Sequence, residues 1–188
     1  MEVKKLKNKF IEIFKDNIKR PGADKLLEWL EKSDFFTAPA SSRFHLCCEG
    51  GLLKHSLNVY NRLLEQAKLL NLQETPETLA IVSLLHDLCK VNYYKSSTRN
   101  VKNEITGVWE KVPCYTVDEK FKYGGHGSKS VFLIMNFMPL TPIEATAINC
   151  HMKSVIMSYG YADTKKMKKL SKPDYLLSDF KDILKIIN

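Results

Sequence analysis

Hydrophobic residues recur every three or four positions over much of this chain, which is the spacing of amphipathic helices. The longest such pattern runs from Gly50 to about Leu70, with Leu53, Leu57, Tyr60, Leu64 and Ala67 on one helical face. Shorter patterns predict helices over Phe10–Ile18 and Asp24–Leu30, which are separated by the turn signal Arg20-Pro21-Gly22. Further helices are expected from Pro76 to Asp87, Ser128 to Phe137, Pro142 to about Val155, and Asp174 to Ile187. The pattern therefore predicts an all-α helical bundle.

Two of these helices have strong start signals. Thr75-Pro76-Glu77 combines a capping threonine with a proline at the first helical position. Thr141-Pro142-Ile143-Glu144 contains the residues of a capping box. Gly124-Gly125-His126-Gly127, by contrast, is predicted to form a loop before the next helix.

The segment from Val91 to Val117 differs from the rest because it is rich in β-branched and aromatic residues. Asn103 to Gly107 at its centre indicates a turn, so we expect a β-hairpin with arms Thr98–Lys102 and Val108–Val117. The arms are too polar to enclose a core of their own. The prediction is thus a hairpin inserted at about residues 91–123 into a domain spanning 36–188, with residues 1–35 as a helical extension packed on the same domain.

Composition favours a compact domain, since 44% of the 188 residues are hydrophobic. No run of about 18 to 20 apolar residues is present, and Met1 to Lys5 lacks a secretory pattern, so we expect a cytoplasmic protein without a membrane partner. The five cysteines contain no CxxC pair and are interpreted as reduced thiols. The net charge of +8 comes largely from two lysine-rich stretches, which attract phosphates or simply form solvated helix faces.

Candidate chemistry lies in the histidines, at positions 45, 55, 86, 126 and 151. A single histidine is more commonly a hydrogen-bonded core or surface residue than a ligand. Here His86 is followed by Asp87, and Lys90 comes one helical turn later, where an ammonium group can meet a phosphate oxygen. Imidazoles and carboxylates from separate segments suit one or two catalytic metal ions.

The chain resembles the HD-domain metal-dependent phosphohydrolases over about residues 36 to 182. The resemblance rests on the HDxxK motif at His86 to Lys90, on Gly50-Gly51-Leu52-Leu53-Lys54-His55-Ser56, and on the order of the later histidines. It is closest in pattern to small phage or prophage-type HD hydrolases and to the HD domain of bacterial 3′-to-5′ exoribonucleases. The resemblance implies one ion held by His55, His86, Asp87 and a late aspartate, and a second held by Asp87, His126 and His151.

Three residues are candidates for that late aspartate. Ser178-Asp179-Phe180 fits the family pattern best, because Asp179 flanks the apolar face of the predicted last helix. Asp182 points nearly opposite on that helix, and Asp163 is a weaker candidate.

The expected activity is hydrolysis of a phosphoester bond in a nucleotide or related small phosphate compound. Asp87 and Lys90 are the expected catalytic residues. Lys90 is also expected to contact the substrate, together with Arg99 and Lys111, and His45 is expected to lie next to the site. The ligand types allow manganese, iron, cobalt, nickel or zinc, with magnesium at an oxygen-rich position. The alternatives are a 3′-to-5′ exonuclease on single-stranded RNA or DNA, for which aromatic and basic hairpin residues offer stacking and charge, and a non-catalytic nucleotide-binding HD module. The sequence does not indicate the oligomeric state.

Overall fold

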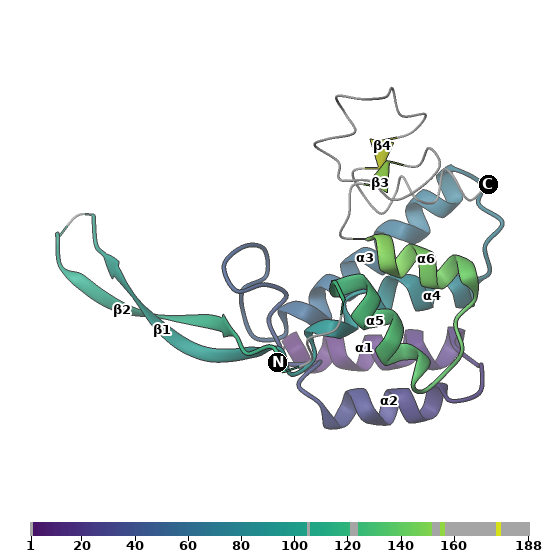
Figure 1. The fold of residues 1–188 in the computed structure, drawn as a ribbon, viewed down its shortest axis with the longest axis horizontal. Coiled ribbons are helices and arrows are strands. Elements are labelled where there is room, and N and C mark those ends of the chain that lie inside the picture. The colour runs from purple at the N-terminus through teal and green to yellow at the C-terminus, as the bar shows by residue number, and fades with distance from the viewer. Residues whose placement is uncertain (1, 105, 121–123, 152–154, 157–175, 178–188) are drawn as a thin grey trace.

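The computed structural model describes residues 2–104, 106–120, 124–151, 155–156 and 176–177 (Figure 1). Its helices are α1 (Glu2–Asn17), α2 (Ala23–Lys32), α3 (Gly51–Leu69), α4 (Pro76–Leu85), the 3-10 helix η1 (Leu88–Lys90), α5 (His126–Met135) and α6 (Pro142–Cys150). Each described α-helix overlaps a helix predicted from the hydrophobic pattern, whereas the 3-10 helix η1 was not predicted. The largest difference is at α1, which begins at Glu2 rather than Phe10, because Val3 and Leu6 also pack against the core.

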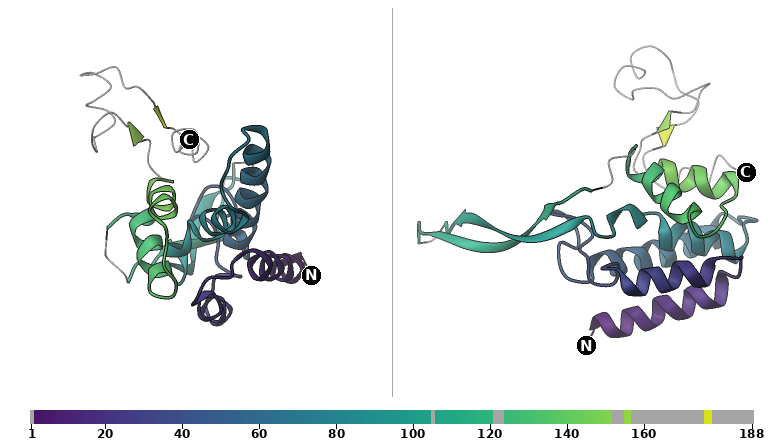
Figure 2. Two further views of the ribbon diagram at one scale, coloured as in Figure 1. Left: turned by 90° about the vertical axis from the view of Figure 1, so that its right-hand side faces the viewer. Right: turned by 60° about the horizontal axis from the view of Figure 1, so that its bottom comes forward.

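Helix α4 lies at the centre of the helical body, where it contacts α1, α3 and α6. All seven residues from Leu79 to Leu85 are buried, so this part of the helix has no solvent face. Phe10 of α1 and Leu26 of α2 belong to the same hydrophobic cluster as α4. Two further views show α1 and α2 running beside the other helices (Figure 2). The N-terminal helices therefore contribute to the same core that surrounds α4.

The hairpin consists of β1 (Tyr94–Lys102) and β2 (Trp109–Val117), which pair antiparallel from Tyr94 opposite Val117 to Lys102 opposite Trp109. Asn103 and Gly107 close its turn, with Gly107 at a φ of 69°. The hairpin projects from the helical body (Figure 1). The prediction of an all-α fold was therefore wrong, because two nine-residue strands make the chain a mixed α and β protein. The first arm is also longer than predicted, beginning at Tyr94 rather than Thr98.

The C-terminal part of the chain departs from the predicted helices. Val155–Ile156 (β3) pairs antiparallel with Leu176–Leu177 (β4). Helix α6 ends at Cys150 instead of reaching Val155, and the helix predicted over Asp174 to Ile187 does not include Leu176 and Leu177. Short apolar runs are compatible with either element, so their periodicity alone could not decide between helix and strand.

Candidate metal centre

The loop before α3 and the first turns of that helix form one wall of the site. Gly50 has a φ of 71°, and a Cβ atom on Gly51 would lie 2.0 Å from the Leu46 carbonyl oxygen. The glycine pair therefore permits the loop to pack directly on the helix start. His55 lies on the second turn of α3, and the ring of His45 from the loop is 5.1 Å from its ring.

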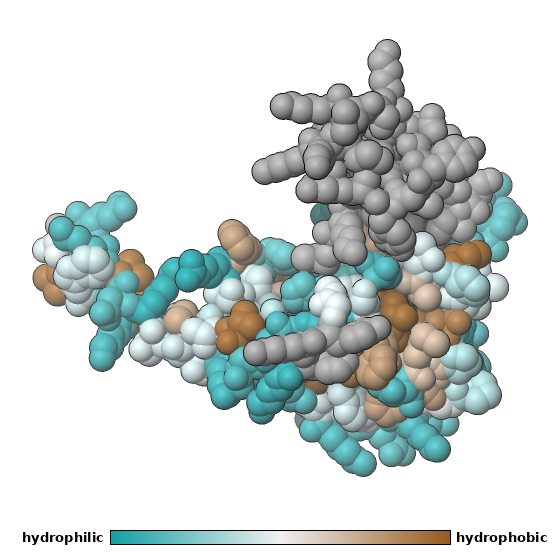
Figure 3. All heavy atoms as spheres, viewed as in Figure 1, coloured by the Kyte–Doolittle hydropathy of each residue, from teal (hydrophilic) through white to brown (hydrophobic). Residues whose placement is uncertain are grey.

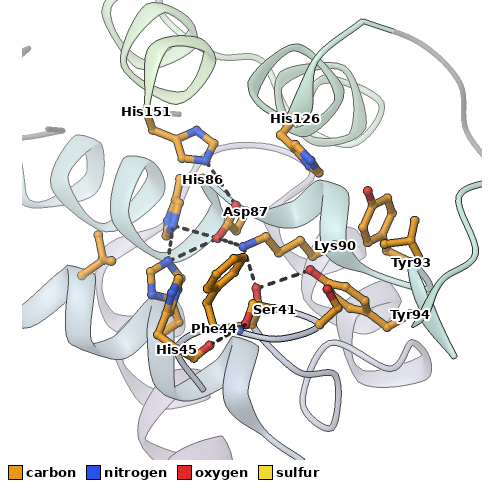
Figure 4. A pocket seen from close by; sticks show the side chains of 15 residues that line it. Ser41, Phe44, His45, His86, Asp87, Lys90, Tyr93, Tyr94, His126 and His151 are labelled. Atoms are coloured by element: carbon orange, nitrogen blue, oxygen red, sulfur yellow. Dashed lines mark hydrogen bonds and ion pairs between the residues drawn. The ribbon is translucent and has the colours of Figure 1, made fainter. Parts of the chain in front are cut away.

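The opposite wall is formed where α4 ends. Helix α4 stops at Leu85, His86 is its C-cap, and Asp87 precedes the 3-10 helix η1. His86 and Asp87 are 3% and 2% exposed, because they follow directly on Leu79–Leu85, the part of α4 that is entirely buried. At the break between α4 and η1 the two side chains lie close together (Figure 4), and both contact His55.

Three ligand atoms meet at this point. Nε2 of His55 is 3.0 Å from Nε2 of His86, and these two nitrogen atoms lie 3.2 and 3.3 Å from Oδ2 of Asp87. Neighbouring ligands bound about 2.1 Å from one metal ion, at angles of 90° to 109°, are separated by roughly 3.0 to 3.4 Å. The spacing of His55, His86 and Asp87 thus fits a single divalent ion.

Main-chain hydrogen bonds orient two of the imidazoles. Nδ1 of His86 donates to the Ser83 carbonyl oxygen at 2.8 Å, and Nδ1 of His151 donates to the Ile148 carbonyl oxygen at 2.6 Å. In the neutral form of each ring, Nε2 then carries a lone pair, and in both residues Nε2 faces Asp87. Lone pairs directed at a carboxylate repel it unless a proton or a metal ion lies between them, so the orientation of these rings is compatible with a metal site.

The protonation states agree with this arrangement. Burial lowers the pKa of His86, although the Asp87 carboxylate acts in the opposite direction. Burial alone would raise the pKa of Asp87, but positive charge on His86 and N–H donation from His151, His55 and His86 hold it well below its ordinary value, a stabilisation that a metal ion would supply when the imidazoles are neutral. A neutral imidazole and an ionised carboxylate are the forms that bind metal ions.

Asp87 also reaches the later histidines through its other oxygen. Oδ1 of Asp87 is 3.2 Å from Nε2 of His151, which caps the C-terminal end of α6. His126 lines the same pocket from the first position of α5, not from the loop that was predicted. Its Nδ1 is 3.3 Å from the Cys89 thiol, and its ring is 5.5 Å from that of Tyr93. His151 is thus in direct contact with Asp87, whereas His126 lies at the side of the pocket near Tyr93.

Lys90 is buried beneath the cluster rather than free in the pocket. Its Nζ donates to Oδ2 of Asp87 and to the Ala40 carbonyl oxygen, both at 2.8 Å (Figure 4). Two of its three N–H groups are therefore used within the protein. This arrangement gives Lys90 a clear role in holding the Asp87 carboxylate, and leaves one N–H for a substrate oxygen.

The remaining predicted residues lie farther away or outside the described part of the chain. Arg99 and Lys111 are exposed on the hairpin. The register pairs Arg99 with Val112 and Asn100 with Lys111, so the two cations point to opposite faces of the ribbon. Asp179, Asp182 and Asp163 are outside the described residues. The helical-phase argument for Asp179 also loses support, because Leu176 and Leu177 belong to a strand.

The ligand cluster opens into a pocket of about 440 Å³. Its lining includes residues that the motif search did not identify as site residues: Ala40, Ser41, Ser42, Phe44, Val59, Tyr93, Tyr94 and Val117. Phe44 is 83% exposed, an unusual state for a phenylalanine, and its neighbour His45 was the only signal in the sequence for this loop. Main-chain groups such as the Ala40 carbonyl have no sequence signal at all.

Comparisons with protein families, with curated proteins and with solved structures found no match for this chain. Among the described residues, none of the helices combines the length and the apolar character that a membrane span requires.

Proposed function

We propose that this chain is a metal-dependent phosphohydrolase of the HD superfamily that hydrolyses a phosphoester bond of a nucleotide or related small phosphate compound. The proposal rests chiefly on the convergence of His55, His86 and Asp87, whose ligand atoms lie 3.0 to 3.3 Å apart. Among the described residues, Lys90 is the one lysine or arginine that forms an ion pair with this cluster. The sequence resemblance to HD hydrolases supplies the reaction class.

The pocket size supports a small reacting group. A volume of about 440 Å³ lies in the range of small-ligand sites, roughly 300 to 1,000 Å³. Lys90, the one lysine among the described residues that line the pocket, is already paired with Asp87. A phosphate group would therefore depend on a bound cation for most of its charge neutralisation. The exposed ring of Phe44 and the half-buried ring of Tyr94 offer apolar surface for the organic part of the substrate.

A metal bound here would supply Lewis acidity and lower the pKa of a coordinated water molecule. Asp87 would hold it through Oδ2 together with His55 and His86, while Lys90 fixes the carboxylate from below. His151 is placed to hold an ion or water molecule against Oδ1. In the reaction, a water oxygen forms a bond to phosphorus, the ester bond breaks, and the leaving oxygen takes a proton. His45, at the pocket wall beside His55, is a candidate for binding the substrate or moving that proton.

The test is metal content followed by activity. Purified protein loaded separately with manganese, iron, cobalt, nickel or zinc is expected to retain metal after desalting and to hydrolyse a nucleotide or a model phosphodiester. Asp87→Asn should reduce metal affinity by more than the roughly 10- to 100-fold cost of changing an outer residue of a metal site. Asp118→Asn, at a surface ion pair with Lys95, is the control and should leave metal content unchanged.

A protein that retains none of these metals would contradict the proposal. Metal retention without turnover of any phosphoester would favour the non-catalytic nucleotide-binding alternative. Substitution of both His126 and His151 by alanine is expected to lower a two-ion content to one, and unchanged content would indicate a one-metal site.

A further inference from the structure

The two faces of the hairpin differ in chemistry. Directly paired residues of an antiparallel ribbon lie on the same face, and the faces alternate along each strand. Tyr94 and Val117 are paired at the base of the hairpin, and both line the pocket. We call the face that contains them the pocket face. It also carries Ser96, Tyr115, Thr98, Pro113, Asn100, Lys111, Lys102 and Trp109.

All three aromatic residues of the two strands, Tyr94, Tyr115 and Trp109, fall on the pocket face. Lys102 and Lys111 are on the same face, and none of its paired residues is acidic. The opposite face carries Lys95, Thr116, Ser97, Cys114, Arg99, Val112, Val101 and Glu110. That face has no aromatic residue, and it includes the carboxylate of Glu110. All aromatic rings of the two strands therefore lie on the face that continues into the pocket, together with two of the four strand cations and no strand carboxylate.

This face is also exposed where it is farthest from the helices, since Trp109 is 66% exposed. Figure 3 shows hydrophobic residues at the end of the projecting hairpin, with hydrophilic residues around them. A two-stranded ribbon is only marginally stable by itself in water, and an exposed indole gains much from being covered. The hairpin thus presents a surface suited to a ligand.

The ligand that fits is a single-stranded nucleic acid. Exposed aromatic rings stack on bases of any sequence, and lysines between them neutralise phosphates. The nine residues from Tyr94 to Lys102 span on the order of 27 Å along the strand, enough for several nucleotides. The chain's net charge of +8 also favours a polyanion over a second copy of the same chain, which carries the same charge.

We propose that the pocket face of the hairpin binds single-stranded RNA or DNA and leads one end of the strand to the pocket. Tyr115 and Trp109 stack on bases, and Lys102 and Lys111 contact phosphates. Delivery of the strand end for hydrolysis rests on the proposed function of the pocket, whereas strand binding itself does not. The substrate class is then a nucleotide at the end of a strand.

Strand binding is tested with the full-length chain in EDTA, by fluorescence anisotropy of a labelled oligothymidylate. We expect saturable binding that weakens with salt. Lys111→Glu should weaken it at least fivefold, and Trp109→Ala roughly tenfold. Arg99→Glu is the matched control: it lies in the adjacent pair of residues, changes the charge equally and faces the other way, so its effect should stay within twofold. With Trp29 replaced by phenylalanine, quenching of Trp109 reports stacking directly.

Absence of binding, or equal losses in Lys111→Glu and Arg99→Glu, would overturn the inference. So would a wild-type dimer that Trp109→Ala converts to a monomer, because the face would then bind a second copy. Hydrolysis of small phosphoesters without strand binding would overturn the hairpin inference and leave the proposed function intact. Strand binding by a chain that retains no metal would support the hairpin inference while the proposed function fails.

Discussion

At the scale of single residues, Asp87 is the common partner of the whole site. Its Oδ2 faces His55, His86 and Lys90, and its Oδ1 faces His151. The HDxxK motif explains this only in part. Asp87 and Lys90 are three residues apart, which permits their contact, but the second Lys90 partner is a main-chain carbonyl fifty residues away. Lys90 is accordingly a positioning residue for the carboxylate in this fold.

Replacement of Lys90 by methionine tests that role. Removing one partner of a buried ion pair leaves Asp87 charged and uncompensated, which typically costs roughly 3 to 5 kcal/mol. In EDTA the variant should therefore have a clearly lower free energy of unfolding by urea. Added manganese should recover part of the loss, since a bound divalent ion supplies positive charge at the same oxygen.

Lys54→Met serves as the control for the Lys90 substitution. Lys54 forms an ion pair with Glu2 at 3.3 Å, but both side chains are substantially exposed. Such pairs are worth about 0 to 1 kcal/mol, so the control should change little. If Lys90→Met is as stable in EDTA as the wild type, the buried ion pair has no structural role.

At the scale of elements, local chemistry predicted helix starts better than it predicted positions in the site. Thr75 accepts a hydrogen bond from the Thr78 amide, and Thr141 forms the full capping box with Glu144, as their sequences indicated. The side that each hairpin residue faces was not predictable in the same way. It depends on the register of the two strands, and the predicted arms had different first residues from the observed strands. Arg99 and Lys111 were both predicted to contact the substrate, although they lie on opposite faces of the hairpin.

The capping box of α6 carries a testable energetic consequence. Thr141→Ala removes the side-chain acceptor for the Glu144 amide, and such losses cost about 1 kcal/mol. The melting temperature should fall accordingly. Thr146→Ala removes the same atoms from an exposed interior position of the same helix, where alanine is the better helix former, so it should be neutral or slightly stabilising. Equal effects of the two substitutions would show that capping does not stabilise α6.

Helix α6 also links the core to the site, because His151 is its C-cap and contacts Asp87. The N-cap residue Thr141 and the candidate ligand His151 therefore lie at opposite ends of the same helix. The hydrophobic pattern placed His151 inside a helix that continues to about Val155, whereas α6 ends at Cys150 and His151 is its C-cap. The contact with Asp87 arises from the packing of α4 against α6, which no local pattern specifies.

At the scale of the whole molecule, a buried ion-pair cluster joins the N-terminal helices to the rest of the fold. Arg20, which follows α1, donates to both carboxylate oxygens of Glu144 at 2.8 and 2.9 Å and to Glu77 at 3.3 Å. The Glu144 side chain is fully buried and also accepts a hydrogen bond from Thr78. One carboxylate thus connects α6 with α4 and with the segment between α1 and α2.

This cluster predicts how stability depends on pH. Burial alone would raise the pKa of Glu144, but the hydrogen bonds from Arg20, Thr141 and Thr78 hold it below its ordinary value of 4.5. A carboxyl group whose pKa is lower in the folded than in the unfolded state stabilises the fold above the unfolded pKa. That contribution is lost as the pH falls through the folded pKa. Acidification below about pH 4.5 should therefore release the contact between α6 and the N-terminal helices.

The variant Glu144→Gln isolates this contribution, since glutamine keeps the shape and removes the charge. Its free energy of unfolding should be lower than that of the wild type at pH 7, and the gap should close as the pH falls below 4.5, where the wild-type carboxyl becomes neutral as well. Glu28→Gln, at an exposed pair with Lys32, should follow the wild type throughout. Urea titrations between pH 7 and pH 3 measure the gap, and a gap that does not change with pH would show that the Glu144 charge does not hold the N-terminal helices to the core.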